Sequence, residues 1–104
     1  MSKVSRLSDE SIVDPLLRPL LYRKLLAYVG DSTNTLVEYE IKEDEETNPE
    51  LLAYRLYGDG NLRWIVGVMT NLPDEFMPLP VGYTVHFPPL SVIARTIREV
   101  RESA

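Results

Sequence analysis

The spacing of apolar residues changes along the chain and predicts two short strands separated by helices. In residues 36–42 (LVEYEIK), apolar and charged side chains alternate from Val37 onward, which predicts a half-buried strand. Residues 83–87 predict a second short strand, which Pro88 ends because proline cannot donate to the ladder. The predicted inner faces consist of Val37, Tyr39 and Ile41 on the first strand and of Val85 and Phe87 on the second.

Between the two strands, apolar residues recur at helical spacing in two short runs. The first run begins at residues 48–50, where Asn caps the helix, Pro takes its first position and Glu lies at the positive end of the helix dipole. Gly58 predicts its end, and a second helix is predicted from residue 61 or 62 to Asn71. The short connection predicts that the two helices pack as a hairpin. The acidic run 43–46 is expected to stay solvated.

Two apolar segments flank this central pattern. Residues 14–28 are rich in leucine and predict a helix from Pro19 to about Tyr28, and residues 90–102 predict a last helix. Either segment can cap the chain's own core or bury its apolar side against another protein, and for the last helix the second alternative is favoured. Partner contacts are predicted for apolar residues of both segments and for two residues off the inner face of the helix after residue 48: Leu16, Leu17, Leu20, Leu21, Tyr54, Arg55, Ile93 and Ile97.

The order of these elements predicts an α+β protein in three parts. Residues 1–35 form an N-terminal arm and docking segment, residues 36–88 form one compact β-α-α-β domain, and residues 89–104 form a C-terminal helix. A chain of 104 residues is long enough for one modest core. The core of such a chain is marginal, so the outer segments are expected to need a partner to order them.

Composition narrows the function classes. The net charge of -5 argues against nucleic-acid binding, whose footprint is basic, and the absence of an eighteen-residue apolar run predicts no membrane span. There is no cysteine, and His86 is the only histidine, so no metal site of the usual ligands is predicted. No phosphate-binding loop or nucleophile elbow is present, so we predict no catalytic residues and no cofactor, and an enzyme is the minority hypothesis.

The β-α-α-β order over residues 36–88 resembles the LysM fold. LysM modules have an aliphatic helix that ends in Asn and a closing L-x-x-G-x-x-L-x-I-P pattern. Asn71 stands at the helix-ending position, and residues 79–88 (LPVGYTVHFP) reproduce the closing pattern with Gly82 and Pro88 in place. The resemblance implies a two-stranded antiparallel sheet with two helices on one face.

A closer resemblance is to the baseplate wedge family of contractile-tailed bacteriophages, whose members contain a LysM-like unit. It is carried by L-A-Y-R-L-Y-G-D at residues 52–59, L-R-W-I at residues 62–65, and Asn71. The residues that we take as the fold signature are Tyr57, Gly58, Asp59, Trp64, Asn71, Gly82 and Pro88. The resemblance implies a structural virion protein, made in the host cytoplasm and present in multiple copies around the tail axis. Its expected partners are other wedge proteins, sheath, tube or hub.

Other functions remain as alternatives. A LysM module that binds peptidoglycan or other N-acetylglucosamine polymers would use a groove near Thr47, Asn48, Asn71, Leu72 and Pro73. The acidic run 43–46 makes such binding less favourable. A hydrolase using Asp74 and Glu75 is a weaker alternative, because adjacent loop residues seldom hold the separation that glycosidases need. An acidic adaptor unrelated to phages is the remaining possibility.

Overall fold

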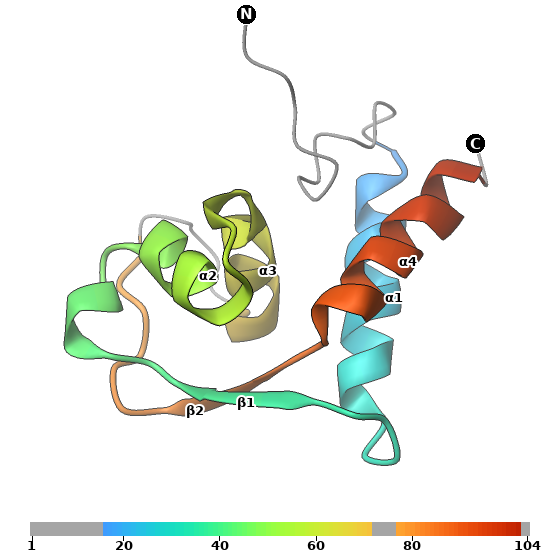
Figure 1. Ribbon diagram of the computed structural model, residues 1–104. Helices are drawn as coiled ribbons and strands as arrows, with labels where there is room; N and C mark the ends of the chain where they lie inside the picture. The colour runs from blue at the N-terminus through green and yellow to red at the C-terminus, as the bar shows by residue number, and fades with distance from the viewer. Residues whose placement is uncertain (1–15, 72–76, 103–104) are drawn as a thin grey trace, which may run out of the picture. The chain divides into compact units, whose positions relative to one another are not determined.

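The computed structural model describes residues 16–71 and 77–102, which form a mixed α+β structure as the sequence predicts (Figure 1). The chain divides into two compact units. One, the central unit, is Val37–Phe87, and the other, the flank unit, contains the described residues 16–36 and 88–102. The elements in chain order are α1 (Arg18–Gly30), β1 (Val37–Glu40), η2 (Glu43–Glu45), α2 (Pro49–Tyr57), η3 (Gly60–Leu62), α3 (Arg63–Thr70), β2 (Thr84–Phe87) and α4 (Leu90–Glu102).

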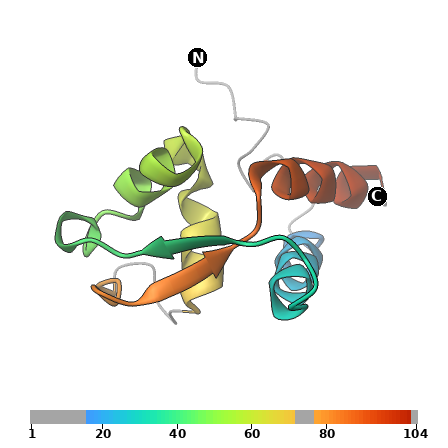
Figure 2. The same ribbon diagram turned by 60° about the horizontal axis from the view of Figure 1, so that its bottom comes forward.

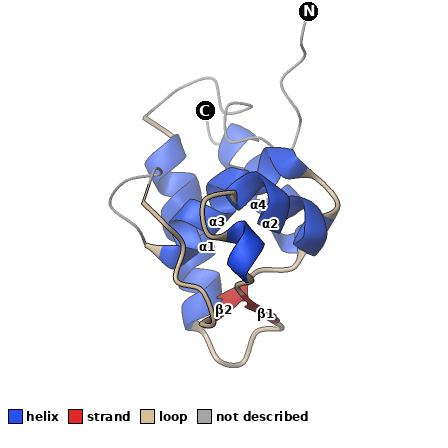
Figure 3. Ribbon diagram, turned by 90° about the vertical axis from the view of Figure 1, so that its left-hand side faces the viewer, coloured by secondary structure: helices blue, strands red, loops and turns tan. Residues whose placement is uncertain are grey.

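The central unit is built on an antiparallel pair of strands. β1 pairs with β2, so that Val37 faces Phe87 and Tyr39 faces Val85 on the inner side. The alternation predicted from the sequence is confirmed, because the residues between these positions are exposed. α2 and α3 lie on the same side of the strand pair (Figures 2 and 3). The exposed face of the sheet carries Glu38, Glu40, Thr84 and His86.

Local signals set the limits of α2, which are the predicted ones. The side chain of Asn48 accepts a hydrogen bond from the Leu51 N–H at 3.1 Å, and Pro49 occupies the first turn, where its missing donor costs nothing. Gly58 ends the helix in the left-handed region at φ 78°, a conformation that glycine adopts without a Cβ clash. The Gly58 N–H donates to the Tyr54 carbonyl at 2.7 Å, which satisfies one of the last carbonyls.

The second predicted helix is divided into two short elements. The carboxylate of Asp59 accepts a hydrogen bond from the Asn61 N–H at 2.9 Å and caps η3, which leads directly into α3. A tight first turn of this kind is common at helix N-termini. Asn71 closes α3 with φ 54°, and its N–H donates to the carbonyls of Gly67 and Val68.

The core of the central unit lies between the strands and the two helices. The edge of the Tyr57 ring packs on Phe87, with ring centroids 6.4 Å apart and planes at 89°. Val66 of α3 is fully buried, as is its neighbour Ile65. The buried apolar side chains of the unit are Ile41, Leu52, Ala53, Leu62, Ile65, Val66, Leu79 and Phe87.

Asn71 offers a first test of these backbone assignments. Asn71→Gly is expected to leave the thermal stability unchanged or slightly raised, because glycine adopts the left-handed conformation freely. Asn71→Ala is expected to lower the free energy of unfolding by about 1 kcal/mol, since a Cβ without a polar side chain is strained at positive φ. Urea titrations followed by the fluorescence of Trp64, the single tryptophan, measure both. Equal effects of the two variants would contradict the assignment.

The flank unit is a pair of helices drawn from the two ends of the chain. α1 and α4 lie side by side and bury apolar residues against each other (Figure 1). α1 begins at Arg18, one residue earlier than predicted, and Pro19 falls within its first turn. After the helix, the Asn34 side chain donates to the Tyr28 carbonyl at 2.9 Å, and the Tyr28 hydroxyl donates to the Thr35 carbonyl at 3.0 Å. These bonds fix the turn that leads to β1.

The helix pairing corrects the predicted role of three docking residues. Leu21 and Ile93 are fully buried and Ile97 is 2% exposed, so these side chains already have an apolar partner within the chain. The prediction that α4 packs on another protein is therefore wrong for this face. The physical reason is that α1 and α4 each carry apolar residues four apart, and two such stripes bury one another.

α4 buries one side and leaves two of its apolar residues at the surface. Leu90 is 39% exposed and Ala94 is exposed, whereas Val92 and Thr96 are turned inward. The hydroxyl of Thr96 donates to the Val92 carbonyl at 2.7 Å, so burial leaves it satisfied. On the surface of α4, Arg95 Nε lies 3.8 Å from Glu99 Oε1, one helical turn away.

Candidate functional site

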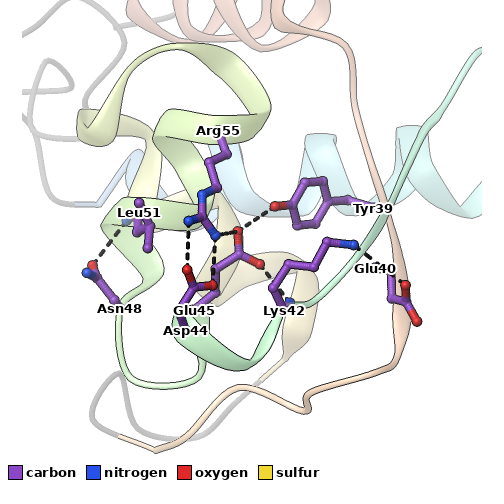
Figure 4. A network of polar contacts seen from close by, with 8 residues as sticks. All are labelled: Tyr39, Glu40, Lys42, Asp44, Glu45, Asn48, Leu51 and Arg55. Atoms are coloured by element: carbon purple, nitrogen blue, oxygen red, sulfur yellow. Dashed lines mark hydrogen bonds and ion pairs between the residues drawn. The ribbon is translucent and has the colours of Figure 1, made fainter.

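The main polar cluster of the central unit surrounds one buried carboxylate. Glu45, in η2, has no exposed surface. Its Oε1 accepts a hydrogen bond from the Lys42 backbone N–H at 2.7 Å, and its Oε2 accepts from the Tyr39 hydroxyl and, at 3.2 Å, from Arg55 Nη1 (Figure 4). Both carboxylate oxygens are therefore engaged by donors from β1, from the following loop and from α2.

Arg55 joins this buried carboxylate to an exposed one. Its Nη1 and Nη2 lie 2.8 and 2.7 Å from the two Asp44 oxygens, a bidentate geometry that fixes the guanidinium (Figure 4). The hydrogen bonds to Asp44 and then Glu45 raise the pKa of Arg55, and the same bond to Arg55 lowers the pKa of Asp44. Burial, followed by the bond to Glu45, raises the pKa of Tyr39 to about 12. At neutral pH, Arg55 is therefore positively charged, Asp44 is negatively charged and Tyr39 keeps its hydroxyl proton.

This network corrects one prediction and bears on a second. The acidic run 43–46 does not stay wholly solvated, because Glu45 turns inward to meet Tyr39 and Arg55. Arg55 stays a predicted partner contact: its guanidinium is bonded to Asp44 and Glu45 of the same chain, but its side chain is still 39% exposed. The arrangement fixes the loop after β1 to helix α2. Its evident role is to hold the acidic loop in one conformation.

The other predicted partner-binding residues divide by exposure. Leu16 is 82% exposed and Tyr54 is 63% exposed, so both lie at the surface where a partner can reach them. Leu17 and Leu20 are half-buried. The structure also exposes apolar side chains that the sequence analysis did not single out: Leu26, Met77, Val81, Tyr83 and Leu90. The turn signal around Gly82 could have indicated exposure at the tip of its loop.

Each fold-signature residue either fixes the backbone conformation at a turn or helix end, or is at least half-buried. Gly58, Asn71 and Gly82 have positive φ values of 78, 54 and 87°. Asp59 caps η3, and Tyr57 packs on Phe87, where burial raises its pKa. Trp64 is half-buried, and Pro88 is buried. The motif is therefore one that specifies local structure.

The groove predicted for a glycan is described only in part. Thr47, Asn48 and Asn71 are exposed, but the side-chain oxygen of Asn48 is already used by the N-cap of α2. Leu72 and Pro73, and the weaker catalytic candidates Asp74 and Glu75, lie outside the described residues. The described residues do not bring a cluster of exposed aromatic and amide side chains to this place.

The described part of the chain contains neither a metal-binding cluster nor a membrane-spanning helix. Across residues 16–71 and 77–102, no set of three or more His, Cys, Asp or Glu side chains is placed to hold a metal ion. In the same part of the chain, none of the helices has the length and apolar character that a membrane crossing requires.

The fold and its polar cluster define a small α+β protein with a two-stranded sheet and an internal carboxylate–guanidinium network. Comparison of the chain with protein-family models, with curated proteins and with solved structures gave no match.

The exposed side of the network predicts a change at acid pH. Asp44 has a lowered pKa because of its hydrogen bonds to Arg55, so the folded state favours its charged form. The stability it contributes is present above the unfolded pKa, near 3.8, and is lost as the pH falls through the lower folded value. Asp44→Asn is therefore expected to flatten the acid side of a plot of melting temperature against pH. A variant with the wild-type acid slope would contradict this.

Proposed function

We propose that this chain is a structural component of a contractile phage tail baseplate, whose LysM-like central unit serves assembly. The observation that carries the proposal is the motif Tyr57-Gly58-Asp59 followed by Trp64 and Asn71, which resembles that of the baseplate wedge family. The proposal is supported by the β-α-α-β order of the central unit, in which these residues limit helices or fill the core.

The mechanism we propose is packing between rigid surfaces. The Glu45 network and the caps hold the central unit in one conformation, so its exposed side chains are presented without an ordering cost on binding. Tyr54 and Leu16 are exposed enough to anchor neighbouring tail proteins, whereas Leu21, Ile93 and Ile97 stabilise the flank unit instead. Aromatic and leucine anchors at the surface are typical of interaction sites.

Immunolabelling of phage particles tests this proposal. An antibody against the chain should label the baseplate end of contractile tails in lysates that contain it, and the chain should co-sediment with the particles. Leu16→Asp or Tyr54→Asp should reduce incorporation several-fold at unchanged folding, while Ser32→Asp, a change at another exposed site, should not. Recovery of the chain only in particle-free fractions would overturn the proposal.

Glycan binding is tested separately by sedimentation with purified peptidoglycan. The acidic residues 43, 44 and 46 are exposed beside the predicted groove, and we expect the chain to stay in the supernatant at moderate salt. Retention there, with loss of binding on addition of N-acetylglucosamine oligomers, would favour the peptidoglycan-binding function.

A further inference from the structure

The charges of this chain are divided unequally between its two units. By sequence, the segments 1–36 and 88–104 together hold eight basic and six acidic residues, whereas Val37–Phe87 holds three basic and ten acidic residues. The net charge of -5 therefore combines a basic flank unit with a strongly acidic central unit. Surfaces of opposite sign within one chain can recognise one another between copies.

The basic surface includes an apolar face of α1 that α4 does not cover. Leu16, two residues before the start of α1, is 82% exposed and Leu26 within the helix is 46% exposed, although Leu21 and Leu25 of the same helix are fully buried. Arg23 and Lys24 are exposed among these leucines and form no ion pair with the described residues. We call Leu16, Arg23, Lys24 and Leu26 the basic α1 face.

The acidic surface includes a second apolar group, at the loop end of the central unit. The segment 77–83 runs beside residues 41–46, because the Leu79 N–H donates to the Glu46 carbonyl at 2.7 Å and the Ile41 N–H donates to the Tyr83 carbonyl at 3.0 Å. Met77, Val81 and Tyr83 are 43%, 38% and 68% exposed. Glu43 and Glu46 are exposed beside them and form no ion pair with the described residues. We call these five residues the acidic strip.

We propose that the basic α1 face of one copy docks on the acidic strip of a second copy of this chain. Each surface combines exposed apolar side chains with two charges, and the charges are opposite. Arg23 and Lys24 meet Glu43 and Glu46, while Leu16 and Leu26 cover Val81 and Tyr83. The contact joins unlike surfaces, so it repeats as a closed ring or an open filament unless two copies exchange both contacts and close as a dimer.

Charge exchange between two variants tests this contact in the full-length chain. Sedimentation velocity of the wild type should show mass that rises with concentration. The dissociation constant should increase by at least about tenfold between roughly 0.1 M and 1 M salt, where the screening length falls from about 10 to 3 Å. The double variants Arg23→Glu/Lys24→Glu and Glu43→Lys/Glu46→Lys should each remain monomeric, and their equimolar mixture should associate again.

A matched control separates the specific contact from net charge. Arg98→Glu/Arg101→Glu makes the same charge change in the same unit but on α4, and it should associate like the wild type. Circular dichroism verifies folding, and recovery in the mixture excludes a folding defect as the cause. A wild type that is monomeric at every concentration, or a mixture that stays monomeric, overturns the proposal. The self-contact does not depend on the baseplate function, since it is measured with the purified chain alone.

Discussion

Replacing Glu45 with alanine is expected to lower the free energy of unfolding by about 3 kcal/mol, one of the two largest effects that we predict. The buried carboxylate accepts from the Tyr39 hydroxyl, the Lys42 N–H and Arg55. Alanine removes both acceptor oxygens and with them all three hydrogen bonds, leaves the Lys42 N–H without its side-chain acceptor and opens a cavity. Urea unfolding followed by the fluorescence of Trp64, which lies in the same unit, measures the loss.

Two matched variants show whether the loss comes from the hydrogen bonds. Glu45→Gln keeps the shape of the side chain and one acceptor oxygen. It should lower the free energy of unfolding by about half as much as Glu45→Ala does. Glu43→Ala removes an exposed carboxylate from the same short helix, and we expect a change within about 0.5 kcal/mol. If Glu45→Ala were as mild as Glu43→Ala, the network would contribute little to the fold.

Replacing Leu21 with aspartate is expected to lower the free energy of unfolding by about 4 kcal/mol and to separate α1 from α4. Leu21 has no exposed surface, so a carboxylate placed there would lose its hydration within the apolar contact between α1 and α4. Far-ultraviolet circular dichroism should show a loss of helix at room temperature or a large fall in the melting temperature. Leu21→Ala should also lower the free energy of unfolding, by about 3 kcal/mol.

Leu16→Asp is the natural control for this variant. The residue lies five positions earlier and is 82% exposed, so the same substitution should change stability by less than about 0.5 kcal/mol. The pair of variants distinguishes a leucine that holds the flank unit together from one that is available to a partner. Similar stabilities for Leu16→Asp and Leu21→Asp would contradict the observed pairing of α1 with α4.

The local structure of the central unit followed from the sequence because its signals act within a few residues. Asn48 and Pro49 start α2, Gly58 ends it, and both limits were predicted. The alternation around Tyr39 correctly assigned the inner face of β1. Capping, positive φ and period-two alternation each depend on neighbours in the chain, so they can be recognised without knowledge of the fold.

The partners of the apolar and charged faces were decided only by the tertiary structure. The sequence indicated that α1 and α4 each have an apolar side, but an apolar side does not specify what covers it. For α1 both alternatives stayed open, and for α4 we favoured a contact with another protein. Glu45 was placed in a solvated run, because its burial depends on Tyr39 and on Arg55, ten residues further along. The amino-acid pattern thus determined where helices and strands begin and end, whereas long-range packing decided which side chains are core, network or surface.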